Sequence, residues 1–270
     1  MTRLSAPMLI VGYGTMTGAM VEGWLAAGYD PADFTVYHPT QAQTGDGLKV
    51  YNDWPDGPFG TILLGVKPHQ LDTVAADVAR VAGRSATILS VLAGVDLAGL
   101  RARFPTAAGV VRVMPNLAVA INASPVALAA QGLSADRREN VTSLAAALGM
   151  AEWLDDEAQF DLVTALAGSG PGFVYRFIDA LAAAADTLGL PRDQAERLAV
   201  AMVQGAGALA AQTPHSPGAL AKRVASPGGM TQRGLDVLDA DSALQRLLTE
   251  TLRATRDHGA KLGTQAREQG

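Results

Sequence analysis

The stretch MLIVGYGTMTG, residues 8–18, decides how this sequence is expected to fold. Its apolar start predicts a short buried strand, and the residues after Gly14 predict the beginning of a helix. In a dinucleotide-binding turn, the first glycine, here Gly12, allows a tight bend, and the second lets a pyrophosphate approach the backbone N–H groups of the helix N-terminus. Glycine also occurs wherever a turn needs positive φ. A strand before the turn and a helix after it favour the dinucleotide-binding interpretation.

Short runs rich in valine, isoleucine and leucine recur through residues 1–155, separated by stretches with helical spacing. The runs cover residues 8–11, 34–37, 61–66, 87–91 and 109–113, and helical spacing occurs at residues 20–27 and 71–81. Continuous apolar strands that alternate with helices are typical of a parallel sheet covered on both faces. The sequence therefore predicts an α/β chain whose residues 1–155 form a Rossmann-like, doubly wound nucleotide-binding domain.

After residue 155 the pattern changes to long helical stretches rich in alanine and leucine. They cover residues 160–167, 171–188, 192–211, 217–224 and 243–262. Since no further strand is expected, residues 156–270 are predicted to form an all-helical domain. These helices carry more apolar surface than a small isolated bundle can bury, which predicts a homodimer.

Composition excludes several classes of function. The net charge of −5 and the 17% of charged residues, without long runs of either sign, disfavour binding to nucleic acid or to an anionic membrane. The absence of cysteine excludes disulfides and thiolate catalysis, and the 4 histidines form no metal-binding motif. Residues 1–7 lack signal-peptide features, and the apolar stretch at 198–211 is shorter than the roughly 20 residues that a bilayer requires. A soluble cytoplasmic protein with a small-molecule partner is expected.

The end of the second predicted strand bears on which dinucleotide would bind. NAD sites favour an acidic residue at this point to hold the ribose 2′-hydroxyl, and residues 36–41, VYHPTQ, contain none. His38 and the hydroxyl of Thr40 could instead accept a 2′-phosphate. NADPH is therefore preferred over NADH, with a plain surface turn as the alternative.

Two cations follow or lie within predicted strands. Lys67 comes at the carboxyl edge of the sheet, where open α/β sheets bind ligands, although a solvated lysine is the simpler interpretation. Arg112 lies inside a strand, so it could be a buried, paired structural cation or a ligand contact.

Two glycine-rich segments lie in the predicted helical domain, at residues 167–172 and 226–231. Each presents several backbone N–H groups at or near a helix start, which suits a carboxylate. Either segment alone could simply cap a helix. Two such segments in one domain favour a site for an anionic substrate.

Six segments in matching order make the chain similar to the pyrroline-5-carboxylate reductase family over essentially its full length. They are residues 12–16, 66–68, 93–95, 112–116 and 165–171, and residues 226–229 with Thr231. The resemblance implies reduction of 1-pyrroline-5-carboxylate to L-proline, the last step of proline biosynthesis. It also implies homodimers built through interlocked C-terminal helices, often assembled into decamers.

The resemblance assigns two sets of residues. Those implied to bind the cofactor are Gly12, Gly14, Thr15, Met16, His38, Thr40, Val66, Lys67, Ala93 and Gly94. Those implied to bind the substrate are Asn116, Ser226, Gly228, Gly229 and Thr231. In the first set the turn would hold the pyrophosphate, Thr40 would face the 2′-phosphate, and Ala93 and Gly94 would lie near the nicotinamide. In the second set, backbone amides would hold the carboxylate and Thr231 would be the catalytic residue.

The reaction that the resemblance implies transfers a hydride from the nicotinamide to C5 of the cyclic imine. That carbon is more electrophilic when the ring nitrogen is protonated, and the Thr231 hydroxyl would orient and polarise this nitrogen. Water or substrate can supply the proton, so the protein mainly contributes positioning. An active site poor in titratable residues is expected.

The sequence departs from the usual family pattern at several positions. Thr17 stands where a third glycine or alanine would permit close packing, and we expect a small helix shift rather than loss of the site. Leu117 and Ala118 follow Asn116 where the family usually has Thr-Pro, Ser216 replaces a usual histidine, and Met230 is unusual. A paralogous reductase of a related cyclic imine therefore stays open as an alternative.

Two further alternatives are another kind of enzyme and a protein without catalytic activity. The first is a β-hydroxyacid dehydrogenase or an imine reductase with a similar order of domains. A β-hydroxyacid dehydrogenase would carry a catalytic lysine on the first long helix after the sheet, and residues 173–188 contain Arg176 but no lysine. A non-catalytic dinucleotide-binding regulator would have kept the fold while its site drifted. The intact loop at 226–229 with Thr231 argues against this second alternative.

Overall fold

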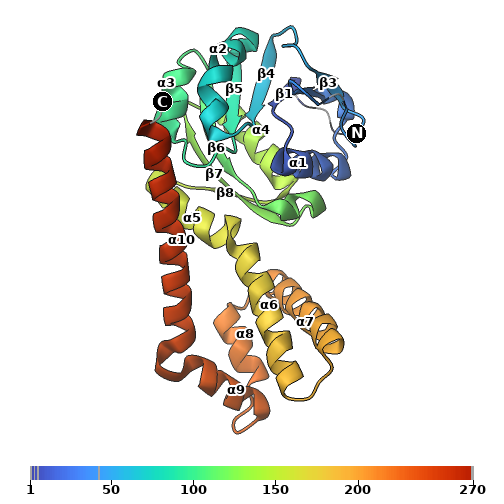
Figure 1. Cartoon of the computed structure of the whole chain (residues 1–270), viewed down its shortest axis with the longest axis vertical. Coiled ribbons are helices and arrows are strands. Elements are labelled where there is room, and N and C mark those ends of the chain that lie inside the picture. The colour runs from blue at the N-terminus through green and yellow to red at the C-terminus, as the bar shows by residue number, and fades with distance from the viewer. Residues whose placement is uncertain (1, 3, 5, 42, 269–270) are drawn as a thin grey trace. The chain divides into compact units, whose positions relative to one another are not determined.

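The computed structural model describes residues 2, 4, 6–41 and 43–268. The chain divides into two compact units, one made of Met1–Gly168 with Thr255–Gly270 and the other of Ser169–Ala254 (Figure 1). The predicted domain boundary at residue 155 stays a prediction.

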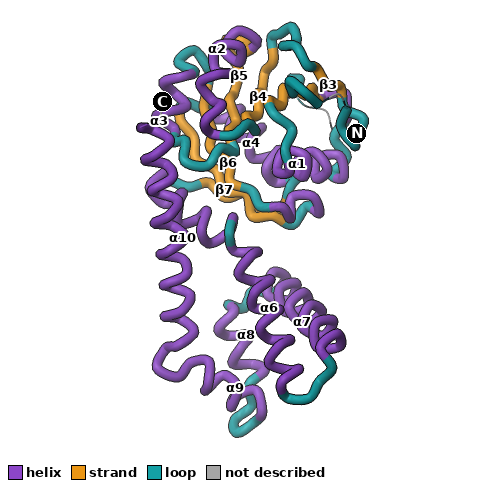
Figure 2. Tube along the Cα trace, viewed as in Figure 1, coloured by secondary structure: helices purple, strands orange, loops and turns teal. Residues whose placement is uncertain are grey.

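The first unit is built on a sheet that, in the described residues, has eight strands in the order β3-β2-β1-β4-β5-β6-β7-β8. Figure 2 shows the strands of this sheet in orange, with helices around them. Neighbouring strands pair in parallel except β6 and β7, which are antiparallel. The strands are β1 (Met8–Val11), β2 (Phe34–Tyr37), β3 (Lys49–Tyr51), β4 (Phe59–Leu64), β5 (Ala82–Ser90), β6 (Gly109–Met114), β7 (Ser124–Gln131) and β8 (Gly149–Trp153). The predicted Rossmann-like architecture, dominated by parallel strands, is confirmed.

Helices cover both faces of this sheet, because alternate strand residues supply two separate cores. On one face, α1 (Thr15–Ala26) and α4 (Ala135–Ala146) pack on residues such as Ile10. On the other face, α2 (Leu71–Val81) and α3 (Leu97–Arg103) pack on residues such as Leu9.

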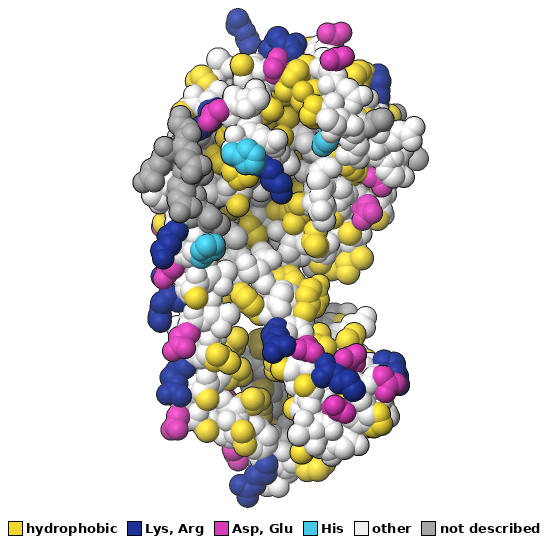
Figure 3. Space-filling view, in the orientation of Figure 1, with side chains coloured by type: hydrophobic (Ala, Val, Ile, Leu, Met, Phe, Trp, Pro, Cys, Tyr) yellow, Lys and Arg dark blue, Asp and Glu magenta, His cyan; other side chains and the backbone are white. Residues whose placement is uncertain are grey.

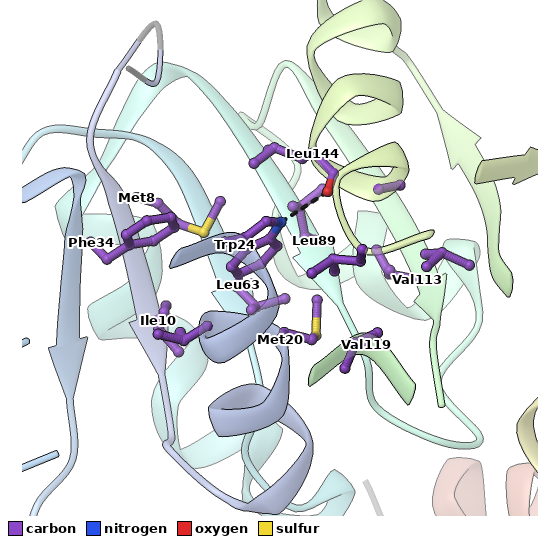
Figure 4. Close-up of a cluster of buried hydrophobic side chains, with 14 of the residues drawn as sticks. Met8, Ile10, Met20, Trp24, Phe34, Leu63, Leu89, Val113, Val119 and Leu144 are labelled. Atoms are coloured by element: carbon purple, nitrogen blue, oxygen red, sulfur yellow. Dashed lines mark hydrogen bonds between the residues drawn. The ribbon is translucent and has the colours of Figure 1, made fainter. Parts of the chain in front are cut away.

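Trp24 ties the first of these cores together (Figure 4). Its indole stacks on Phe34, with ring centroids 5.5 Å apart, and its Nε1–H donates to the Leu144 carbonyl at 2.9 Å. The buried indole therefore satisfies its polar group while it joins α1 to β2 and α4.

Three strands are not expected from the sequence. β3 is short, and β8 lies at the end of the sheet with alternating half-buried and exposed residues, so neither forms a continuous apolar run. β7 is rich in alanine, which is a poor strand signal. The predicted strand at 61–66 instead covers Phe59–Leu64, because the chain turns at Gly65.

The second unit is helical, as the sequence predicts. It contains α6 (Gly170–Thr187), α7 (Arg192–Gln212), α8 (Pro217–Val224), α9 (Met230–Asp239) and the beginning of α10 (Ala243–Glu268). Helix α6 ends at Thr187 and is followed by Gly189, whose φ of 102° suits glycine. Asp179 and Arg192 form an ion pair that joins α6 to α7. Helix α9 lies in a region where the sequence pattern predicts only a helix start.

Large apolar side chains remain exposed on the helical unit (Figure 3). On α6 and α7 they are Val174, Tyr175, Phe177, Leu181, Leu198, Val200, Met202 and Leu209. An apolar surface of this kind is typical of a protein interface. No helix in the described part of the chain is long and apolar enough to cross a membrane.

Candidate active site

The carboxyl ends of β1, β2, β4 and β5 surround a cavity of about 930 Å³ in the first unit. Its lining includes every residue that the family resemblance assigns to the cofactor except Gly94. These residues are Gly12, Gly14, Thr15, Met16, His38, Thr40, Val66, Lys67 and Ala93. The fold thus brings together residues from four separate segments at the edge where open α/β sheets bind ligands.

The turn after β1 has the conformation that a dinucleotide-binding turn requires. Gly12 has φ of +88°, and a β-carbon on it would lie 3.0 Å from atoms of Gly65 and Val66. Its N–H donates to the Tyr37 carbonyl at 3.0 Å, which ties β1 to β2. Gly14 is the N-cap of α1, and a β-carbon there would meet no atom within 4 Å, so its outer side is open. Backbone N–H groups at this helix start are available to an anion.

The turn after β2 is held by side chains that the sequence did not identify as structural. The His38 Nδ1 accepts hydrogen bonds from the backbone N–H groups of Gln41 at 3.0 Å and Thr40 at 3.4 Å. The Asn52 side-chain amide donates to the carbonyls of His38 and Gln41, both at 2.9 Å. Because Nδ1 acts as an acceptor, the ring nitrogen that can donate to a ligand is Nε2.

Two side chains from neighbouring turns also line this cavity. Lys67 is exposed, and its backbone N–H donates to the Gln70 Oε1 at 3.0 Å, which fixes the turn after β4. The Tyr13 hydroxyl donates to the Asp46 carboxylate. Burial first, and then the hydrogen bond to Asp46, raise the pKa of Tyr13, so this phenol stays protonated. Tyr13 occupies a variable position of the glycine pattern, which is why the motif could not identify it.

A second, more apolar cavity of about 260 Å³ shares Met16, Val91, Leu92 and Ala93 with the first. It adds Gly94, whose φ is +76°, and Arg112 and Phe160. The two cavities are therefore adjacent at the end of β5. The turn that the resemblance assigns to the nicotinamide lies where they meet.

Arg112 is a buried, paired cation, which was one of the two interpretations of this residue. It is 7% exposed, its Nη1 lies 2.9 Å from the Glu157 Oε1, and its guanidinium lies 3.7 Å from the centroid of the Phe160 ring. The same carboxylate oxygen accepts the Leu97 N–H at 2.8 Å. These contacts join β6, α3 and the start of α5 (Phe160–Val163) in the wall of the smaller cavity, which Arg112 and Phe160 line.

Asn116 is buried, and its polar groups make hydrogen bonds within the first unit. Its Oδ1 accepts the Ala118 N–H, and its Nδ2 donates to the Ala167 carbonyl, both at 2.9 Å. Its own N–H donates to the Ser124 hydroxyl at 3.0 Å. These bonds connect the end of β6 to the segment before α6, and Leu117, at the adjoining departure from the family pattern, is 54% exposed.

The predicted substrate loop lies in the second unit, between α8 and α9. Gly228 has φ of +74°, and the Gly229 N–H donates to the Ser226 carbonyl at 2.9 Å. Gly229 is the N-cap of α9, whose first turn carries no acidic residue. Thr231 is exposed at the second position of this helix, beside Met230, which is 94% exposed. The other glycine segment differs, because its Gly168 packs against the Met114 sulfur in the first unit.

The larger cavity presents backbone N–H donors, hydroxyls, a lysine and an imidazole. Such donors suit a phosphorylated dinucleotide. No group of His, Asp and Glu residues in the described ranges could hold a metal ion.

Comparison with known proteins agrees with this geometry. The family description "Pyrroline-5-carboxylate reductase dimerisation" matches residues 157–262. The chain is 30% identical to a pyrroline-5-carboxylate reductase of Pseudomonas aeruginosa, over 97% of this chain and 99% of that protein. It is 32% identical to one of Synechocystis, over 96% of this chain and 99% of that protein.

Solved structures give the same result. A pyrroline-5-carboxylate reductase from Coxiella burnetii superposes with a TM-score of 0.89 at 28% identity, covering 96% of this chain and 98% of the other. The fold is also that of a Plasmodium falciparum pyrroline carboxylate reductase with NADP bound, with a TM-score of 0.79 at 20% identity, covering 97% of this chain and 100% of that one. Since the similarity in sequence extends over both units, this chain belongs to the pyrroline-5-carboxylate reductase family.

Proposed function

We propose that this protein reduces 1-pyrroline-5-carboxylate to L-proline, using NADPH in preference to NADH, with hydride delivered to C5 of the imine. The observation that carries the proposal is the cavity lined by Gly12, Gly14, His38, Thr40 and Lys67 in a chain of this family. Proline biosynthesis would be the pathway served.

The residues present fit a dinucleotide with a 2′-phosphate. Gly12 to Met16 would hold the pyrophosphate on backbone N–H groups, and Val66 and Lys67 would line the cleft beside it. His38 and Thr40 would face the 2′-phosphate, and Ala93 and Gly94 would lie near the nicotinamide. A cavity of about 930 Å³ has the size of a cofactor site. When bound, NADPH supplies the hydride.

The substrate would be held by the loop at 226–231. Its backbone N–H groups at the start of α9 would bind the carboxylate, and the Thr231 hydroxyl would hold the ring nitrogen. Ser226, Gly228 and Gly229 would shape this loop. Asn116 would support the substrate side of the site through its bonds to Ala118 and Ala167. A proton can come from water or substrate, so the protein contributes mainly orientation.

Assembly would follow the helical region. We propose that residues 1–155 form the NADP-binding domain and that 156–270 form the substrate-binding and dimerisation domain, with a homodimer through the C-terminal helices and a decamer above it. The exposed apolar residues of α6 and α7 support this, as does the match to a dimerisation family over residues 157–262. The protein would act in the cytoplasm.

The test is oxidation of NADPH by the purified protein, followed by the absorbance of the reduced nicotinamide. Parallel reactions contain 1-pyrroline-5-carboxylate, pyrroline-2-carboxylate or piperideine-6-carboxylate, and each is repeated with NADH. Fastest turnover with the first imine, and with NADPH, supports the proposal. A preference for another imine identifies a paralogous reductase, and tight NADPH binding without turnover of any imine identifies a regulator.

A further inference from the structure

Thr17 is buried in the first turn of α1, at the position where dinucleotide-binding turns usually have a third glycine. Its hydroxyl lies 3.2 Å from the carbonyl oxygen of Gly12 and 3.2 Å from that of Gly14, so it donates to either. Its Cγ2 methyl lies over Gly65, and a β-carbon on Gly65 would overlap that methyl. The side chain therefore touches all three glycines around the turn.

Glycine is needed at position 65 because there is no room for a side chain, and not because of the backbone conformation. It does not have positive φ, and its N–H makes a regular hydrogen bond of 2.9 Å to the Val11 carbonyl. An alanine would be compatible with this backbone, yet its β-carbon would overlap Thr17 and approach the Gly12 carbonyl oxygen to 3.0 Å. The missing side chain at 65 therefore makes room for the extra one at 17.

The hydroxyl of Thr17 also affects the orientation of the backbone N–H groups in the turn. The peptide group is planar, so the Gly12 carbonyl fixes the direction of the Tyr13 N–H, and the Gly14 carbonyl fixes that of the Thr15 N–H. Both residues line the larger cavity. A hydrogen bond to either carbonyl thus restrains the N–H groups that would meet a pyrophosphate.

We propose that Thr17 and Gly65 form a matched pair that positions the pyrophosphate-binding turn, with Thr17 as the positioning residue. This inference rests on the proposed cofactor-binding function of the turn. At the position where a third glycine would permit close packing of helix and strand, Thr17 places a side chain that holds the turn from inside. The substitution works only because position 65 has no side chain.

The experiment is a double-mutant cycle on the full chain, with NADPH affinity measured by fluorescence titration. Gly65→Ala should weaken NADPH binding about 10-fold or more, because overpacking displaces the turn. Thr17→Ser keeps the hydroxyl, loses the methyl, and should stay within about 3-fold of wild type. In Thr17→Ser with Gly65→Ala, affinity should return to within about 3-fold of Thr17→Ser alone. Gly83→Ala, whose new β-carbon would make only ordinary contacts at 3.4 Å and 3.5 Å, is the matched control.

A second measurement separates positioning from plain stability. Thr17→Val keeps the shape of the side chain and removes the hydroxyl, so NADPH affinity should fall about 5-fold. Affinity for adenosine 2′-phosphate, which lacks the pyrophosphate, should stay within about 2-fold. This arm holds even if Gly65→Ala does not fold.

Three results would overturn the matched pair: additive losses in the double variant, unchanged NADPH affinity in Gly65→Ala, or equal losses for NADPH and adenosine 2′-phosphate in Thr17→Val. Failure of the proposed function would look different. NADPH would bind to wild type and the two substitutions would show the predicted coupling, yet wild type would reduce no imine. A wild-type protein that binds no NADPH would overturn both.

Discussion

Two loops of this protein have similar local chemistry but differ in how tightly other residues pack around them. The turn at 12–17 and the loop at 226–231 each lead into a helix whose N-cap is a glycine and whose first turn has no acidic residue. Gly12 packs against Gly65 and Val66, and Thr17 packs against Gly65; both partners follow β4, which pairs with β1 in the sheet. In the other loop, a β-carbon on Gly228 would meet nothing within 4 Å, and Thr231 is exposed.

The capacity to bind an anion is thus distinct from the rigidity of the site. Both loops offer backbone N–H groups at a helix N-terminus. Only the first is fixed by long-range packing within its own unit, so it should be preformed in a single chain. The second makes few contacts of its own, and segments of this kind open at low cost in free energy. We expect its order to depend on ligand or on a second subunit.

The largest effect is expected from Gly12→Val. Valine at position 12 would have to adopt φ of +88°, which is unfavourable for a β-branched residue, and its side chain would collide with Gly65 and Val66. NADPH affinity should therefore fall about 100-fold or more. Fluorescence titration measures it, with Gly83→Ala as the control. Unchanged affinity would mean that the turn at 12–17 is not held more rigidly than the loop at 226–231.

The next effect concerns the helical unit. Leu198 and Met202, 55% and 48% exposed, lie one turn apart on α7 and so share a face. Replacing both with Asp should weaken the homodimer about 30-fold or more, as measured by sedimentation, because charge would be buried at an apolar interface. NADPH affinity should be retained while turnover falls.

The matched control for this pair is the double variant Leu198→Met with Met202→Leu, which exchanges the two side chains and keeps the surface apolar. It should dimerise as wild type does. An unchanged dimer in the Asp variant would place the interface elsewhere.

Thr231→Ala should lower turnover about 10-fold through loss of one hydrogen bond in the transition state. The KM for NADPH should not change, because the cofactor turn is supported independently. Thr231→Ser keeps the hydroxyl and should retain most activity. Wild-type turnover in the alanine variant would remove Thr231 from the mechanism.

The smallest effect is expected from breaking an ion pair between two helices of the first unit. Arg103 contacts Asp72 through Nε at 2.5 Å and Nη2 at 3.0 Å, which joins α3 to α2. The hydrogen bond from Arg103 holds the pKa of Asp72 below its usual value. The stabilisation is therefore present at neutral pH and is lost as pH falls through the folded-state pKa. Because Asp72 is 56% exposed, Asp72→Asn should cost less than about 1 kcal/mol at pH 7.

Thermal or urea unfolding of Asp72→Asn and wild type at pH 7 and at pH 2 measures this difference. The gap in stability between the two proteins should be greatest at pH 7 and should close in acid. A gap that widens in acid would contradict the assigned pKa direction.

Much of the fold could be predicted because its signals are local. The apolar runs at 8–11, 34–37 and 109–113 and the helical spacing after residue 155 report burial directly. β7 and β8 carry weak signals of their own, and their place beside β6 is decided by long-range pairing. The antiparallel register of β7 against β6 therefore could not be predicted.

The cofactor side of the candidate site was also largely predictable, since Gly12, Lys67 and Thr40 each follow a strand whose carboxyl end reaches one edge of the sheet. The hydrogen-bond partners of the individual side chains could not be predicted. His38 holds its own turn through Nδ1, which accepts from backbone N–H groups that any residue at positions 40 and 41 would supply, so no side-chain pattern reports these bonds. Tyr13 binds Asp46, which lies 33 positions away along the chain, and only folding brings the two side chains together.

Local patterns predict a doubly wound sheet followed by helices, and they predict where an anionic cofactor and an anionic substrate would bind, because periodicity and glycine-rich helix starts depend on neighbouring residues. The fit of Thr17 where glycine is usual comes from tertiary packing, since it depends on Gly65, which follows the end of another strand. Tertiary packing also pairs Arg112 with Glu157. Packing joins residues that are distant in sequence, and no local pattern specifies their separation in space.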